Sequence, residues 1–182
     1  TKFLKWTEKK GFSISYSDRI IKDWRKLMNL INKPLPASFE RLSIPDSDKI
    51  HLPPEELSIL ESADVLNRSE LLARDWFLIM CETGLRVSDV LTLTLDNIIN
   101  GKITIKKTIK TGSEFSVPDN SRLKRIRENY HGNWPPVLAD VLINRYIKIV
   151  AERAKIENAK EITCHTGRRS FITNRLNAGI SV

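Results

Sequence analysis

The stretch from Thr163 to Gly179, TCHTGRRSFITNRLNAG, is typical of a turn that leads into a helix and ends at a glycine. Because a helix brings residues three and four apart onto one face, His165 is expected one turn from Arg168 and Arg169. Free backbone N–H groups in the first turn also favour an anion, and a forked guanidinium suits a phosphate best. By itself, this stretch is better explained as a basic surface helix with an incidental histidine.

Charge is distributed unevenly along the 182 residues. Residues 1–100 hold 14 Lys and Arg against 15 Asp and Glu, whereas residues 101–182 hold 16 against 7. The basic excess in the second part predicts a polyanion partner, although charge alone does not separate nucleic acid from an anionic membrane or from a solvated face. A hydrophobic content of 41% is enough for the core of one ordinary domain, or of one domain plus a fragment.

Membrane, secretory and metal signals are absent from the sequence. No apolar run has the length of a spanning helix and no signal peptide opens the chain, so we expect a soluble intracellular protein without a membrane partner. Cys81 and Cys164 have neither metal-ligand spacing nor a disulfide pattern, and we expect both thiols to be reduced.

Two helices and a linker are predicted at the start of the chain. The first helix spans residues 1–10, and the second is capped by Ser17 or Asp18 and continues to Ile31. Several prolines between residues 32 and 54 exclude a regular element there, which indicates a linker. Because the two opening helices bury little by themselves, we expect them to belong to a neighbouring helical domain.

After the linker, the pattern predicts mainly helices and one small sheet. Asn100-Gly101 is a strong hairpin signal between residues 98–99 and 103–105, and Thr111-Gly112 marks a second turn before a strand at 115–117. The expected fold is mixed α/β, mainly α-helical, with a small three-stranded antiparallel sheet. Helices are predicted from Pro54 onward and at 69–81, 87–93, 121–130 and 137–154.

Arg86 and Lys110 are the other candidate ligand-binding residues. Arg86 lies in the stretch ETGLRVSD, after a glycine that ends an apolar helix. An arginine at the edge of a core is costly to bury unless it is paired, so a structural salt bridge to Asp89 is the alternative. Lys110 precedes a hairpin turn, where a flexible ammonium can reach a ligand. Its alternative is a solvated turn lysine.

Three motifs occur in a specific order: Thr-Gly-Leu-Arg at 83–86, Lys-Thr-Gly at 110–112 with Val-Pro at 117–118, and His-x-x-Arg-x-Ser-Phe at 165–171. This order resembles the tyrosine recombinase family, the phage-type integrases. The third motif is most similar to integrases of bacterial phages and conjugative transposons. The resemblance implies a catalytic domain at 46–182, preceded at 1–45 by the end of a helical core-binding domain and a linker.

The resemblance also implies roles for four residues. Arg86 and Arg168 would grip the scissile phosphate, and Lys110 would protonate the leaving 5′ oxygen. His165 would either assist proton movement at the attacking side or hold the phosphate. The implied reaction cuts and rejoins double-stranded DNA through a 3′-phosphotyrosyl intermediate without a metal or other cofactor. A tetrameric synapse on DNA and a cytoplasmic, prokaryotic protein are implied as well.

The tyrosines depart from the family pattern. Tyr16, Tyr130 and Tyr146 all precede His165, whereas the family's Gly-His or Trp box and its tyrosine nucleophile follow the His-x-x-Arg helix. We therefore expect the nucleophile to lie outside residues 1–182, and we expect these residues alone not to cleave DNA. A type IB topoisomerase-like enzyme and a non-catalytic helical DNA-binding module are the two alternative functions.

Contacts with the DNA backbone are expected from basic residues of the hairpin, of the helix after it and of the last helix. Such contacts would hold phosphates without reading bases. The candidates are Lys106, Lys107, Arg122, Lys124, Arg125 and Arg169.

Overall fold

The computed structural model describes residues 2–36, 42 and 49–180. The chain divides into two compact units, residues 1–48 and residues 49–182. The expected boundary between residues 45 and 46, and much of the expected linker, lie outside the described residues.

The first unit contains α1 (Lys2–Lys9) and α2 (Ile14–Leu30), close to the two helices predicted. The predicted cap of α2 was wrong, because the helix begins earlier. The Ser13 hydroxyl accepts a hydrogen bond from the Tyr16 N–H at 3.2 Å, so Ser13 satisfies a free donor of the first turn. Ser17 and Asp18 lie within the helix, and both are buried. The Asp18 carboxylate pairs with the Lys22 ammonium at 2.9 Å.

The second unit is mainly helical, with one small sheet, as the sequence predicted. The short α5 ends three residues earlier than expected, because the next two N–H groups, of Thr92 and Leu93, bind carbonyls three residues back instead of four. The elements are α3 (Pro54–Glu61), α4 (Arg68–Thr83), α5 (Val87–Val90), η1 (Leu95–Asn97), β1 (Ile98–Ile99), β2 (Lys102–Ile105), β3 (Phe115–Pro118), α6 (Ser121–Glu128), α7 (Asp140–Arg153), η2 (Ala159–Glu161) and α8 (Cys164–Asn177).

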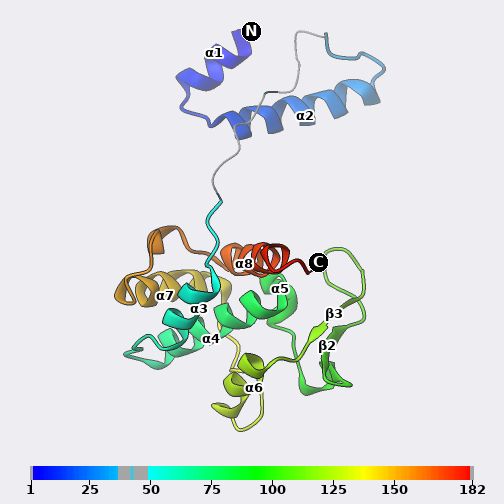
Figure 1. The fold of residues 1–182 in the computed structure, drawn as a ribbon. Coiled ribbons are helices and arrows are strands. Elements are labelled where there is room, and N and C mark those ends of the chain that lie inside the picture. The colour runs from blue at the N-terminus through cyan, green and yellow to red at the C-terminus, as the bar shows by residue number, and fades with distance from the viewer. Residues whose placement is uncertain (1, 37–41, 43–48, 181–182) are drawn as a thin grey trace. The chain divides into compact units, whose positions relative to one another are not determined.

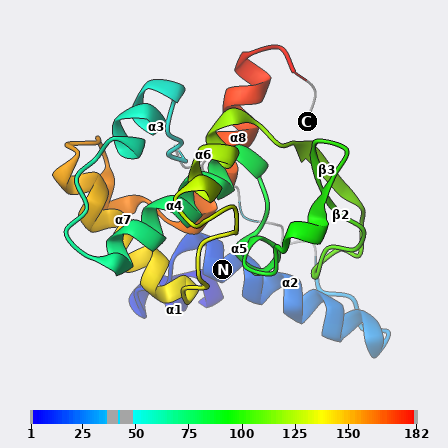
Figure 2. The ribbon, with the colours of Figure 1, turned by 90° about the horizontal axis from the view of Figure 1, so that it is seen from below.

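The three strands form an antiparallel sheet in the order β1-β2-β3. Asn100 and Gly101 both have positive φ, as a two-residue hairpin turn requires. Ile103 pairs with Val117, and both side chains are buried. Within this unit, Figures 1 and 2 show β2 and β3 on the side opposite α7, so that the β2–β3 loop projects at the edge of the unit.

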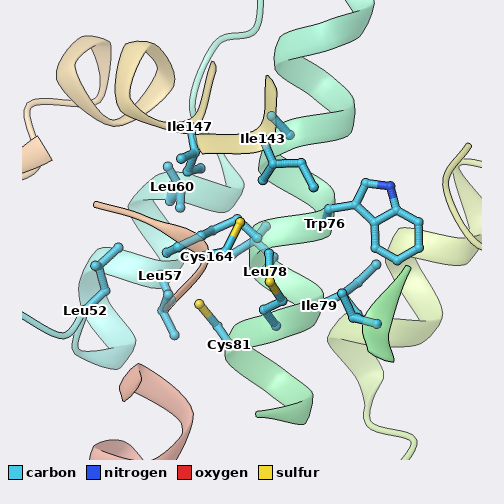
Figure 3. Packing of buried hydrophobic residues seen from close by; sticks show 14 of the residues in the cluster. Leu52, Leu57, Leu60, Trp76, Leu78, Ile79, Cys81, Ile143, Ile147 and Cys164 are labelled. Atoms are coloured by element: carbon cyan, nitrogen blue, oxygen red, sulfur yellow. The ribbon is translucent and has the colours of Figure 1, made fainter. Parts of the chain in front are cut away.

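The core of the second unit is built around α4. This helix packs against α7 and α8 and also contacts α3, α5 and α6. Figure 3 shows side chains of α4, α7 and α3 meeting here, with the two cysteines among them. Most of α4 is buried, including Trp76, whose indole N–H donates to the Pro136 carbonyl at 3.0 Å. Because α4 is enclosed, the turn at its carboxyl end is held firmly.

Candidate functional site

The turn after α4 presents Arg86. Gly84 ends the helix at φ +67°, a conformation that glycine adopts without steric cost, and its N–H donates to the Met80 carbonyl at 2.8 Å. Leu85 is buried and anchors the turn. The next residue, Arg86, is the N-cap of α5, where its carbonyl accepts hydrogen bonds from Asp89 and Val90. The backbone of Arg86 is therefore fixed, while its side chain is only half-buried.

The helix α8 lies close against the end of α4. A Cβ added to Gly167 would lie 3.1 Å from the Met80 Cβ, so glycine permits this approach. The Thr163 N–H donates to the Thr166 hydroxyl at 3.1 Å, and the Asn144 side chain accepts from the Cys164 N–H at 2.8 Å. These contacts fix the start of α8, which places Arg168 beside the turn that carries Arg86.

Arg168 and Arg86 come close together although 82 positions separate them in the chain. The Arg168 guanidinium donates to the carbonyl oxygen of Gly84. Burial, and then the positive charge of Arg86, lower the pKa of Arg168, and the charge of Asp89 opposes this effect only in part. Within the described part of the chain, neither arginine forms an ion pair with a carboxylate. Two neighbouring guanidiniums that pair with no described carboxylate favour an anion.

Asp89 connects the arginine pair to the β2–β3 loop. Its carboxylate is 2% exposed and accepts a hydrogen bond from the Ile109 N–H at 2.7 Å. Among the described residues, its other oxygen has no hydrogen-bond partner. The expected alternative, an Arg86–Asp89 salt bridge, does not form. Because Ile109 precedes Lys110, this hydrogen bond ties the backbone beside the predicted lysine to α5, the helix that begins at Arg86.

His165 and Lys110 are both exposed. His165 lies in the first turn of α8, three residues before Arg168, as the sequence predicted. The turn at Lys110 is also present: Gly112 has φ +66° and donates its N–H to the Thr108 carbonyl at 2.9 Å. The four predicted residues therefore come from the first turns of α8, the start of α5 and the β2–β3 loop.

The predicted DNA-contacting residues fall into two groups. Lys106, Lys107 and Lys124 have exposed side chains. The three predicted arginines, Arg122, Arg125 and Arg169, all form hydrogen bonds or ion pairs within the protein. Arg169 donates to the Ile50 carbonyl at 2.8 Å, and Arg125 pairs with Glu61 at 2.8 Å although its side chain is 55% exposed.

Arg122 is the arginine that is most involved in the protein's own contacts. Its side chain is 18% exposed and pairs with Glu61 at 2.8 Å and with Glu82. Asn120, the N-cap of α6, also donates to Glu82. Contact of Arg122 with DNA stays a prediction, and the structure gives this residue a second role that joins α6 to α3 and α4.

Neither tyrosine of the second unit lies with the arginine pair. Tyr130 donates to Asp75 at 2.8 Å, and burial together with the Asp75 charge raises the pKa of this phenol. Tyr146 packs against the hydrophobic core from α7. Tyr16 belongs to α2 in the first unit. Raising a phenol pKa makes the oxygen harder to ionise, so Tyr130 is poorly suited to attack phosphorus.

The contact between Asp89 and Ile109 was missed by sequence reasoning. Asp89 was considered only as a partner of Arg86, three residues away. No local signal indicates a hydrogen bond to a backbone N–H twenty residues later. A hairpin loop that carries a functional lysine does need an anchor, but its partner emerges only from tertiary packing.

The described residues form neither a metal site nor a membrane-spanning helix. Across residues 2–36, 42 and 49–180, no group of three or more His, Cys, Asp or Glu side chains is placed to hold a metal ion. In the same part of the chain, no helix is long and apolar enough to cross a membrane.

Solved structures of integrases and recombinases are similar to this chain. The Tn1549 transposon integrase (residues 82–397) in complex with circular intermediate DNA matches with a TM-score of 0.68 and 17% identity, over 99% of this chain and 72% of that chain. The XerH site-specific recombinase bound to difH matches with a TM-score of 0.65 and 17% identity, over 95% and 57%.

A lambda integrase (residues 75–356) dimer bound to a COC′ core site matches with a TM-score of 0.65 and 16% identity, over 97% of this chain and 72% of that chain. No profile of a protein family matches the sequence. No curated protein is significantly similar to it either. The chain has the fold of these integrases and recombinases, which confirms the fold expected from the tyrosine recombinase resemblance.

Proposed function

We propose that this chain is the phosphate-binding part of a tyrosine recombinase, which cuts and rejoins strands of double-stranded DNA at specific sites. The observation that carries the proposal is the Arg86–Arg168 pair. These two guanidiniums lie close enough for one charge to lower the pKa of the other, and neither pairs with a described carboxylate. The fold shared with DNA-bound integrases and the three ordered sequence motifs support the same conclusion.

The arginine pair would bind the scissile phosphodiester. During phosphoryl transfer, negative charge gathers on the non-bridging oxygens, and forked donors aimed at those oxygens stabilise the transition state. Arg168 keeps one N–H on the Gly84 carbonyl, which orients the guanidinium and leaves its other donors for the phosphate. Arg86 would contact the same phosphate from the start of α5.

Lys110 would protonate the 5′ oxygen as it leaves phosphorus. The Asp89–Ile109 hydrogen bond, which ties the β2–β3 loop to α5, supports this role, and the ammonium of Lys110 is exposed. His165, one helical turn before Arg168, would bind a phosphate oxygen or assist the proton that leaves the nucleophile.

The nucleophile would be a tyrosine outside residues 1–182, supplied by the same polypeptide or by a second subunit. Its hydroxyl oxygen would attack phosphorus, forming a 3′-phosphotyrosyl bond as the bond to the 5′ oxygen breaks. Attack by a free 5′ hydroxyl would then reverse these bond changes and rejoin the strand. The separation of Tyr130 and Tyr146 from the arginine pair supports an outside nucleophile. Assembly of a tetrameric synapse is part of this proposal.

The test is a nicked duplex that carries the native recombination site, incubated with the full-length protein. Cleavage next to the nick releases a short fragment that diffuses away, so the covalent adduct accumulates and migrates slowly on a denaturing gel. A recombinase forms this adduct at its own site. A DNA-binding module retards the duplex on a native gel but leaves no adduct after denaturation, which would contradict the proposal.

A parallel plasmid assay separates the recombinase from a type IB topoisomerase-like enzyme. Such an enzyme relaxes a supercoiled plasmid that lacks the recombination site, whereas a recombinase acts only where the site is present.

Binding of a mixed-sequence duplex should weaken steeply as salt rises, because each protein–phosphate contact releases counterions that high salt returns.

A further inference from the structure

The β2–β3 loop, residues 106–114, is closed by its own hydrogen bonds. The Thr108 N–H donates to the Ser113 carbonyl at 3.0 Å, and the Gly112 N–H donates to the Thr108 carbonyl at 2.9 Å. The hydroxyls of Thr108 and Thr111 lie 2.8 Å apart. In Figure 1 this loop extends beyond the strands that it joins. The loop therefore has a defined shape and presents the same side chains outward.

Ile109 is the apolar residue that this loop presents to solvent. Its N–H is bound to the buried Asp89 carboxylate at 2.7 Å, yet the residue is 65% exposed. Lys107 and Lys110, both exposed, flank it. A β-branched side chain on a fixed backbone has few conformations to lose, so burying it against a ligand costs little entropy.

We propose that Ile109 makes an apolar contact with the sugars and base edges of bound DNA, next to the phosphate held by Arg86 and Arg168. This inference rests on the proposed function. A duplex offers apolar surface in its grooves, between two rows of phosphates, and exposed aliphatic side chains in DNA-binding proteins use that surface. The cations on both sides of Ile109 suit the flanking phosphates, and the apolar side chain suits the groove between them.

A contact of this kind has a recognisable signature. An aliphatic side chain neutralises no phosphate, so its loss weakens binding without changing the number of counterions released. A plot of the logarithm of the binding constant against the logarithm of the salt concentration keeps its slope, while the binding constant is reduced at every salt concentration. Loss of a lysine–phosphate contact would instead reduce the slope.

The experiment compares Ile109→Thr with Ile109→Val, because threonine and valine have the same shape and differ in a hydroxyl. Binding of the full chain to a labelled duplex is measured by fluorescence anisotropy over a series of salt concentrations. We expect Ile109→Thr to bind about tenfold more weakly at every salt concentration and Ile109→Val to stay within about threefold of the wild type, as burial of one or two methyl-sized groups predicts. Val137→Thr is the control, because Val137 is 69% exposed and lies outside the loop.

Three results would overturn the inference. In the first, Ile109→Thr binds like the wild type. In the second, Val137→Thr weakens binding as much as Ile109→Thr does. In the third, Ile109→Thr lowers both the salt slope and the melting temperature, which would mean that the loop itself has moved. Failure of the proposed function is distinguishable, because the full-length wild-type protein would then form no covalent adduct with the nicked duplex, whatever the Ile109 variants do to binding.

Discussion

The guanidinium of Arg168 donates a hydrogen bond to the carbonyl oxygen of Gly84, and this bond joins α8 to the turn that carries Arg86. The two arginines are thus positioned by one shared piece of backbone. A shift of α8 would move both donors relative to a bound phosphate. The geometry of the site therefore depends on the packing of α4 against α8 as much as on the charged residues themselves.

Replacing Arg168 by lysine should remove strand cleavage while leaving the fold intact. Lysine keeps the positive charge, but it lacks the fork that contacts two phosphate oxygens. We expect covalent adduct formation to slow by about 10²- to 10³-fold, as for loss of one donor to a transition-state oxygen. The measurement is adduct yield over time with the nicked duplex, together with the melting temperature.

Arg86→Lys should behave like Arg168→Lys, because Arg86 forms no ion pair with Asp89 whose loss would destabilise the fold. The matched control is Arg169→Lys. Arg169 follows Arg168 in α8, but its guanidinium donates to the Ile50 carbonyl. That control should keep most of the adduct. Wild-type adduct yield in the Arg168→Lys protein would contradict the phosphate-binding role.

Gly84→Ala should destabilise the second unit more than an alanine at another glycine with the same backbone conformation. Gly84 and Gly101 have φ of +67° and +72°, so alanine costs about 1–2 kcal/mol at either position. At Gly84 the new Cβ would also overlap the Phe171 ring, whereas nothing lies within 4 Å of the corresponding position at Gly101. Overpacking adds about 1–3 kcal/mol. Urea unfolding of both variants checks this difference, and equal losses would contradict it.

Arg122 and Lys107 should respond differently to loss of charge. Arg122→Gln leaves Glu61 and Glu82 without their shared partner, so we expect a loss of about 1–2 kcal/mol in the free energy of unfolding. Lys107→Gln should leave stability unchanged and reduce the salt slope of DNA binding by about one. Chemical unfolding and anisotropy titrations measure the two effects. The reverse pattern, with Arg122 controlling the slope, would assign Arg122 to DNA.

The Glu70–Arg153 pair should contribute to stability at neutral pH and lose that contribution in acid. Hydrogen bonds from Arg153, at 2.7 Å, and from the Leu66 N–H lower the pKa of Glu70. Because its pKa is lower in the folded chain than the value of about 4.3 in the unfolded chain, the contribution is present above that value and is lost as pH falls through the folded pKa. Melting temperatures between neutral pH and about pH 3 should fall less steeply for Glu70→Gln. An identical pH profile would exclude the linkage.

The local signals in this sequence were sufficient for most of the fold. Asn100-Gly101 predicted its hairpin because a two-residue turn with two positive φ values requires such residues, and the helical spacing of His165 and Arg168 followed from the period of a helix. The cap of α2 was misplaced because Ser13 and Ser17 are equally good capping residues. Only Gly11, which lies just after the first helix and so allows the second to begin soon afterwards, favours Ser13 as the cap.

The partners of charged residues could not be predicted in the same way. The carboxylates that hold Arg122 lie on α3 and α4, far earlier in the chain, and they meet α6 only through packing. Asp89 looked like a partner of Arg86, because neighbours three residues apart on a helix are the pairs that a sequence reveals. Its actual partner is a backbone N–H, which has no sequence signature.

Lys110 should act as the general acid for the leaving 5′ oxygen. Lys110→Ala should slow cleavage of an ordinary phosphodiester by about 10²- to 10⁴-fold, the usual effect of a positioned acid. A 5′-bridging phosphorothiolate releases sulfur, which needs no proton, so the variant should cleave that substrate at nearly the wild-type rate. Lys106→Ala and Lys107→Ala are the controls. These two lysines belong to the same loop but lie before Ile109, whose N–H donates to Asp89, whereas Lys110 directly follows it.

Both controls should cleave the ordinary substrate with little loss, since they contribute charge to DNA binding and not the proton. If Lys110→Ala stays equally slow on both substrates, Lys110 only positions the DNA. If the sulfur substrate instead rescues Lys106→Ala or Lys107→Ala, the acid is that other lysine.

Because the hydrogen bond from the Ile109 N–H to Asp89 fixes the backbone beside Lys110, Asp89→Ala should also slow cleavage of the ordinary substrate. Sulfur should restore that rate only in part, since a displaced loop disturbs DNA contacts as well as proton transfer.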